Sequence, residues 1–215
     1  MNKSKIPTVI RKLAIEAGEK IMEIYEAGDL MVKAKLDKSP VTVADEIADA
    51  LISDGLRAAF PESVLVTEEQ VDTHFATSDT FFIVDPLDGT KEFLEGTGEF
   101  TVNIALIVEA EAVLGLIAAP NRGHLDFGVP DWGARRYPLF SEQEGEDLST
   151  RLLDPTARLV MSASARHREE RVQMMLTRLA ELAQGSERLD AGSALKFCDV
   201  ASGRADVYPR TSPCY

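Results

Sequence analysis

Two aspartates three residues apart follow a short apolar run, and this spacing suits a metal site. The run from Phe81 to Val84 is β-favouring and is followed by Asp85-Pro86-Leu87-Asp88-Gly89-Thr90. This pattern predicts a buried strand that ends by delivering Asp85 into a stiff turn. Converging carboxylates repel each other unless one is protonated or a cation lies between them, and Mg²⁺ prefers oxygen ligands. An ordinary turn capped by aspartates is the alternative interpretation.

A second pair of acids follows another short strand. The run from Ser63 to Thr67 is β-branched and leads into Glu68 and Glu69. If this strand and the strand before Asp85 are neighbours in one sheet, their carboxyl ends lie side by side. Glu68 or Glu69 would then lie within reach of Asp85 and Asp88. The alternative is a solvated, charged turn.

Asp45 lies in the first turn of a predicted helix. Thr42 is typical of an N-cap and Asp45 of the acid three positions later, in a helix that continues to Pro61. The expected buried face consists of Ala44, Ile47, Ala48, Leu51, Ile52 and Leu56. An acid in the first turn also complements the helix dipole, so a purely structural role is the alternative to a catalytic one.

The composition limits the classes of function. The chain has 215 residues, 45% of them hydrophobic, and a formal net charge of −13. Binding to a nucleic acid polymer depends on clustered cations, so we expect no such partner. Neither a signal peptide nor an apolar stretch of about 18 residues is present, which predicts a cytoplasmic protein without a membrane span. Two cysteines, Cys198 and Cys214, favour reduced thiols.

The first part of the chain predicts helices and a sheet. Residues 8–27 have an amphipathic helical pattern, residues 33–40 indicate a loop, and residues 91–98 indicate a short turn or helix. Further strands are expected at Thr101 to Val108, Ala112 to Ala118 and Leu125 to Val129. We expect one domain over residues 1–150 and another over residues 151–215.

The second part predicts alternating strands and helices. The expected elements are a strand from Leu159 to Ser162, a turn containing His167, a helix from Glu169 to Ala183, a short helix between Gly192 and Gly203, and a strand from Arg204 to Arg210. The longer helix is expected to bury Val172, Met175, Leu176, Leu179 and Leu182. Ser193 and Lys196 are expected on one helix face, because three residues make about one turn.

Taken together, five motifs resemble those of one phosphatase superfamily. They are Ser39-Pro40-Val41-Thr42-Val43-Ala44-Asp45, Thr67-Glu68-Glu69, Asp85-Pro86-Leu87-Asp88-Gly89-Thr90, Gly192-Ser193-Ala194-Leu195-Lys196-Phe197-Cys198 and Tyr208-Pro209-Arg210. The chain resembles the inositol monophosphatase superfamily of Mg²⁺-dependent phosphatases, and the last two motifs resemble its 3'(2'),5'-bisphosphate nucleotidases of sulfur assimilation. The resemblance implies an α+β fold, a layered α-β-α-β-α sandwich with the site between its two halves.

The resemblance also implies roles for individual residues. The metal ligands would be Glu68, Asp85, the carbonyl of Leu87, and Asp88, around two or more Mg²⁺ ions. Thr90, with Glu68 and Asp45, would position and deprotonate the attacking water. The implied contacts to a small phosphorylated substrate are Asp88, Gly89, Thr90, His167, Ser193, Lys196 and Arg210. Hydrolysis of a phosphate monoester needs an activated water and neutralised charge, which a two-metal site supplies.

The sequence departs from the family pattern at two places. The usual Ser-Arg-Ser-His becomes Ser164-Ala165-Arg166-His167, and Arg210 is followed by only five residues instead of a Trp-Asp pair. The family aspartate of the second metal site then has no counterpart, so we expect a weakened second site and an incomplete C-terminal part. An inositol-type sugar phosphatase and a catalytically impaired metal- or nucleotide-binding remnant are the alternatives, and a homodimer is a further expectation.

Overall fold

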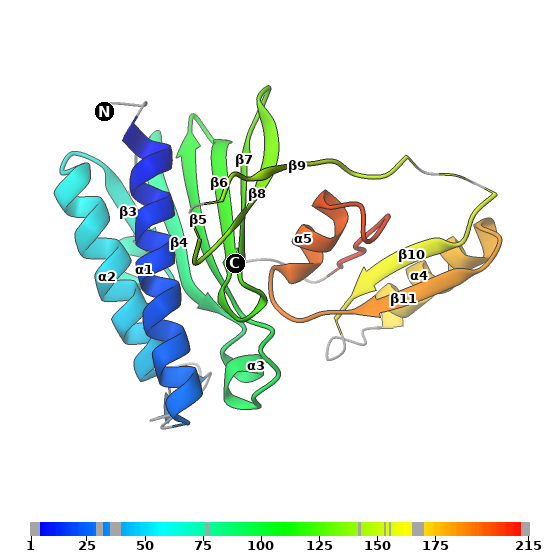
Figure 1. Cartoon of the computed structure of the whole chain (residues 1–215), viewed down its shortest axis with the longest axis horizontal. Helices are drawn as coiled ribbons and strands as arrows, with labels where there is room; N and C mark the ends of the chain where they lie inside the picture. The colour runs from blue at the N-terminus through cyan, green and yellow to red at the C-terminus, as the bar shows by residue number, and fades with distance from the viewer. Residues whose placement is uncertain are drawn as a thin grey trace. The chain divides into compact units, whose positions relative to one another are not determined.

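The structure, a computed structural model, describes residues 5–28, 32–34, 40–75, 78–141, 143–152, 154, 156–164 and 170–211. The chain divides into two compact units, Met1–Asp147 and Leu148–Tyr215. Figure 1 shows the elements of each unit.

A seven-stranded sheet forms the centre of the first unit, in the order β3-β4-β5-β6-β7-β8-β9 (Figure 1). β3 pairs with β4 in parallel, and the successive pairs from β4 to β8 are antiparallel. The strands are β3 (Val64–Thr67), β4 (Thr80–Asp88), β5 (Thr101–Val108), β6 (Glu111–Ala119), β7 (His124–Val129), β8 (Gly133–Pro138) and β9 (Glu146–Leu148). Short helical turns lie between some of them, namely η2 (Val71–Phe75), α3 (Thr90–Leu94) and η3 (Pro120–Arg122).

Two long helices cover one side of this sheet. Helix α1 (Ile6–Ala27) contacts β5 and β6, and helix α2 (Val43–Ala59) contacts β3 and β4, so the two lie side by side (Figure 1). The helices approach closely at Gly55, where an added Cβ would lie 2.2 Å from a methyl carbon of Leu13. No helix in the described part of the chain is long and apolar enough to cross a membrane.

Most of the elements expected in the first unit are confirmed. Both long helices form, and Thr42 caps α2 in a capping box with Asp45. The loop expected at residues 33–40 is partly wrong, because β1 (Val32–Ala34) and β2 (Pro40–Thr42) form a small antiparallel pair. Strand β8 was not expected, because residues 120–138 are rich in glycine and proline.

The strand before Asp85 differs from its prediction in two ways. β4 continues through Asp85 to Asp88 instead of ending at Val84. It is also not buried on both faces, because Ile83 is 44% exposed while Phe82 and Val84 are buried. In the described part of this unit, helices α1 and α2 pack on one face of the sheet, so the strand alternates between core and outer positions.

The second unit is a small α/β assembly. β10 (Leu159–Ala163) pairs in parallel with β11 (Ser186–Asp190), and helix α4 (Glu170–Leu182) connects them. The short helix α5 (Leu195–Ala201) follows and contacts β10. The core of this unit contains Leu159, Met161, Ala163, Val172 and Leu176.

Three predictions for the second unit need correction. The strand expected from Arg204 to Arg210 is wrong, because only a single bridge from Val207 to Met161 forms there. Met175 and Leu182 were expected in the core but are 43% and 67% exposed. Strand β11 was not recognised, because its sequence Ser-Glu-Arg-Leu-Asp is polar and its pairing is long-range.

Candidate active site

Two strand ends bring acidic residues to the same edge of the large sheet. The parallel register pairs Val64 with Phe81 and Thr67 with Val84. Just beyond β3, the amide of Glu68 donates a hydrogen bond to the carbonyl of Val84 at 3.1 Å. Glu68 therefore follows β3 beside the part of β4 that leads into Asp85, so the condition that these two strands are neighbours is met.

A bulge in β4 separates the two aspartates. Asp85 pairs with Asn103 and Asp88 pairs with Thr101, and the register shifts between these pairs. Proline has no amide hydrogen to donate to a β-ladder, which explains why the ladder is interrupted after Asp85. Leu87 is 1% exposed and anchors the bulge in the core. The turn inferred from the sequence is thus an irregularity within a strand.

The next residues begin a short helix. Gly89, with φ of 95°, is the N-cap of α3, and its left-handed conformation is readily adopted by glycine. Thr90 is the first residue of the helix. Its hydroxyl lies 3.0 Å from Asp45 Oδ1 and 3.3 Å from the carbonyl oxygen of Leu87. A threonine hydroxyl thereby connects a buried carboxylate to the bulge.

Asp45 is held in place by the start of its own helix. It is 0% exposed, and its Oδ2 accepts hydrogen bonds from the amide of Thr42 at 2.8 Å and from the Thr42 hydroxyl at 2.5 Å. Oδ1 accepts the bond from Thr90. The capping role proposed as the alternative is therefore real, but one oxygen of the same carboxylate faces the bulge.

Burial raises the pKa of Asp45 above its usual value. Desolvation is the largest cause, and the hydrogen bonds from Thr42 and Thr90 oppose it by stabilising the charged form. A carboxylate with a raised pKa accepts a proton more readily than an exposed aspartate does. Asp45 is thus suited to act as a proton acceptor toward Thr90.

A second carboxylate on α2 was not singled out from the sequence. Asp49 is 6% exposed, and its Oδ1 accepts a bond from the Thr67 hydroxyl. Its Oδ2 accepts a bond from Gln70 Nε2 at 2.6 Å. Asp49 therefore accepts hydrogen bonds from the residues on either side of the Glu68–Glu69 turn and stabilises it. Its position four residues after Asp45 was the available signal, because such residues share a helix face.

The atoms at this edge form a set of oxygen donors. Glu68, Asp85 and Asp88 offer carboxylates, and the bulge contributes the carbonyl of Leu87. Hard divalent cations such as Mg²⁺ take oxygen ligands and complete their shells with water and phosphate oxygens, so this set fits such an ion. Among the described residues, these three carboxylates do not form a cluster with all their ligand atoms within 4.8 Å of one another.

The cationic positions expected at the substrate belong to the second unit. Lys196, in α5, is 4% exposed, and its Nζ donates to the carbonyls of Ser193 at 2.5 Å and Ala191 at 3.2 Å. Ser193 precedes α5, with φ of 50°, so the predicted shared helix face is wrong and its backbone makes the contact. Arg210 is exposed and donates to the Tyr208 hydroxyl at 3.4 Å. His167 lies outside the described residues.

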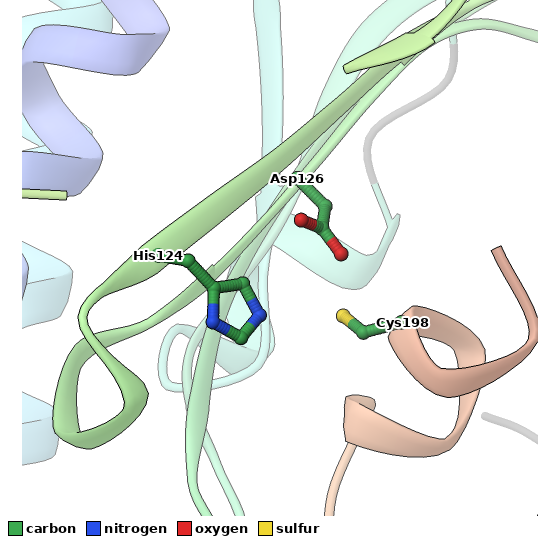
Figure 2. A group of neighbouring side chains, drawn as sticks. All are labelled: His124, Asp126 and Cys198. Atoms are coloured by element: carbon green, nitrogen blue, oxygen red, sulfur yellow. The ribbon is translucent and has the colours of Figure 1, made fainter. Parts of the chain in front are cut away.

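Sequence reasoning also passed over two polar residues on β7. Figure 2 shows His124 and Asp126 on this strand, two positions apart and hence on one face of it. Asp126 accepts bonds from Arg136 at 2.7 and 2.8 Å. Burial, with a contribution from Arg136, lowers the pKa of His124. The alternation of polar and apolar residues from His124 to Val129 was the available signal. Cys198, also drawn there, is a buried residue of α5 in the second unit.

Comparison with known proteins determines the family. A sequence model of the Inositol monophosphatase family matches residues 2–215. The chain belongs to the inositol monophosphatase family. The residues that carried the resemblance in the sequence thus belong to a match over nearly the whole chain, and the expected family is confirmed.

The most similar members of the family that we compared include a nucleotidase. The 3'(2'),5'-bisphosphate nucleotidase CysQ of Escherichia coli K12 is 37% identical over 208 residues, which span 94% of this chain and 79% of that protein. The crystal structure of CysQ from Bacteroides thetaiotaomicron matches with a TM-score of 0.79 and 34% identity, covering 97% of this chain and 81% of that one.

A more distant structure gives the same fold. The extragenic suppressor protein SuhB of Bartonella henselae matches with a TM-score of 0.75 and 26% identity, over 96% of this chain and 79% of that one. These matches confirm the layered α+β fold expected from the sequence. The chain is a phosphatase of the inositol monophosphatase family.

Proposed function

We propose that this phosphatase removes the 3'-phosphate of adenosine 3',5'-bisphosphate, or of its 5'-phosphosulfate relative, to give the 5'-nucleotide and phosphate. The nucleotide assignment is supported by the 37% identity with CysQ of Escherichia coli, a 3'(2'),5'-bisphosphate nucleotidase. It is also supported by Lys196 and Arg210, because a second phosphate on the substrate requires cationic partners, and by Ser193, whose hydroxyl can donate a hydrogen bond to a phosphate.

One observation supports the chemistry more than any other. The Thr90 hydroxyl joins the buried carboxylate of Asp45 to the carbonyl of Leu87, directly after the acidic bulge of β4. A hydroxyl in this position can orient a water molecule while its own hydrogen points to Asp45. An ordinary capped turn would not require a buried acid on a different helix to meet it.

The metal ligands in this proposal are Glu68, Asp85, the carbonyl of Leu87, and Asp88. A bound divalent ion such as Mg²⁺ would lower the pKa of water and neutralise charge on the phosphate oxygens. Glu68 is held by the turn that Asp49 fastens, and Asp85 and Asp88 are held by the strand register on either side of the bulge. The backbone positions of Glu68, Asp85 and Asp88 are thus set by the fold before substrate binds.

The proton follows a path through residues of this chain. As the water oxygen bonds to phosphorus and the bond to the 3'-oxygen breaks, Thr90 Oγ1 accepts the proton of the water and passes its own proton to Asp45 Oδ1. The leaving oxygen takes a proton from solvent. The raised pKa of Asp45, caused first by burial, favours this transfer.

A phosphate-release assay tests the proposal. We expect hydrolysis of adenosine 3',5'-bisphosphate with Mg²⁺, loss of activity with a chelator, and much slower hydrolysis of inositol 1-phosphate. The Asp85→Asn variant, purified in the same way, excludes a contaminating phosphatase. Faster hydrolysis of the inositol ester would replace the nucleotide assignment by an inositol-type phosphatase, and binding of nucleotide without turnover would support an impaired remnant.

A further inference from the structure

A cavity of about 520 Å³ lies in the first unit between α1 and the strands β7 and β8. Helix α1 contributes Arg11, Lys12, Glu16 and Glu19, and the strands contribute Phe127 and Tyr137. Its volume falls in the range of sites for small molecules, and two aromatic rings line it. None of the residues assigned above to the candidate active site lines this cavity.

Arg11 is the distinctive group in the cavity. The Cζ atom of its guanidinium lies 3.9 Å from the centre of the Tyr137 ring, so the side chain is held against an aromatic surface. Its Nε atom is buried and has no hydrogen-bond partner among the described residues. A guanidinium is always charged and carries five donors, so an anion is its natural complement.

The other cations near the cavity, unlike Arg11, form ion pairs with acidic side chains. Lys12 pairs with Glu16 at 3.5 Å, and Arg135, the other cation near the Tyr137 ring, pairs with Asp147 at 2.8 Å. Among the described residues that line the cavity, Arg11 alone is a cation without an acidic partner. Glu19 also lines the cavity, and its carboxylate disfavours a ligand with several negative charges.

We propose that this cavity binds a small aromatic monoanion, with its negative group on Arg11 and its ring against Phe127 and Tyr137. The guanidinium, already stacked on Tyr137, presents a fork that matches the two oxygens of a carboxylate. The rings provide apolar surface for the flat body of the ligand. A neutral aromatic ligand would not pair with the charge of Arg11. A small anion without a ring would not contact the apolar surface of Phe127 and Tyr137.

Titration by fluorine NMR tests the proposal with 4-fluorobenzoate as the probe and 4-fluorobenzyl alcohol as its neutral analogue. We expect saturable binding of the benzoate and at least tenfold weaker binding of the alcohol. The Arg11→Gln variant should weaken benzoate binding at least tenfold, the loss expected for one charge-assisted hydrogen bond. The control Lys20→Gln, an exposed position on the same helix that does not line the cavity, should bind within twofold of the wild type.

Two further variants make the outcome decisive. Tyr137→Leu should weaken benzoate binding, whereas Asp85→Asn should leave it unchanged, because Asp85 belongs to the candidate active site. Equal binding of the acid and the alcohol, equal binding by Arg11→Gln and the wild type, or no saturable binding by the wild type would overturn the proposal. Loss of binding in Asp85→Asn would place the probe at the acidic edge of β4 and would also overturn it. Amide NMR spectra verify that each variant is folded.

Discussion

The acidic edge of the first unit and the Lys196 region of the second unit hold their charges in different ways. Glu68, Asp85 and Asp88 are positioned by the register of β3, β4 and β5. Lys196 lies on a helix of seven residues, and its ammonium group is bonded to two backbone carbonyls. The acids are thus fixed by long-range strand pairing, and the lysine by nearby backbone atoms.

This difference indicates how each region contributes to function. Substitutions at the acidic edge remove charge but leave the backbone pairing of β3, β4 and β5 in place. Lys196 is 4% exposed, so its substitution removes both a cation and the hydrogen-bond partner of two backbone carbonyls. We therefore expect losses of activity with retained stability in the first region, and mixed effects in the second.

The largest effect is expected for Asp85→Asn. Loss of a ligand carboxylate removes several kcal/mol of charge stabilisation in the transition state, which corresponds to a turnover about 10³-fold slower. The melting temperature should change little, because asparagine has nearly the same shape. Asp79→Asn, an exposed site just before β4, is the matched control and should keep full activity. Near-normal turnover of Asp85→Asn at saturating Mg²⁺ would contradict the metal role.

Asp45→Asn is expected to slow turnover by roughly 10²-fold, the lower range for loss of a proton acceptor. Burial raises the pKa of Asp45 in the folded protein above the usual value of 3.8, so the fold favours the protonated carboxyl group. The stabilisation that this proton binding gives is fully present below pH 3.8 and is lost as the pH rises through the raised pKa. The variant removes this titration and should keep its stability at neutral pH. Melting curves and turnover measured across pH 4 to 8 test both points.

The pH profile separates catalysis from capping. Turnover of the wild type should rise with pH as Asp45 ionises, and Asp45→Asn should lack this part of the profile. A large fall in melting temperature with activity retained would instead show that Asp45 serves only to cap α2.

Thr90→Val should reduce turnover by about ten- to a hundredfold, because it removes one hydrogen bond to a buried carboxylate. Thr90→Ser keeps the hydroxyl and should remain within a few-fold of the wild type. Similar activity of the valine and serine variants would show that the hydroxyl takes no part in the reaction.

Lys196→Ala is expected to raise the Michaelis constant about tenfold and to change turnover little, as loss of one charged contact to substrate would. It should also lower the melting temperature, unlike the variants at the acidic edge. Lys20→Ala, at an exposed position on α1, controls for loss of a positive charge. A fall in stability without any change in the Michaelis constant would limit Lys196 to a structural role.

Local sequence signals determined the elements whose patterns are strong. The Thr42–Asp45 capping box lies within about one helical turn. The apolar stripes of α1 and α2 follow a simple helical repeat. The acidic residues that follow two short apolar runs could also be recognised, because the change from apolar to acidic side chains is visible in the sequence. The sequence argument assumed, without predicting it, that β3 and β4 are neighbours, and the structure shows that they pair in parallel.

Other features depended on contacts between distant residues, which a local pattern does not contain. The polar strand β11 is stabilised by pairing with β10, and the predicted strand near Val207 makes only a single bridge. Asp45 meets Thr90 across 45 positions, and Asp49 meets Thr67 across 18. The sequence by itself determined which residues carry charge and which local structures they favour. Tertiary packing decided which oxygen of Asp45 caps its helix and which faces Thr90.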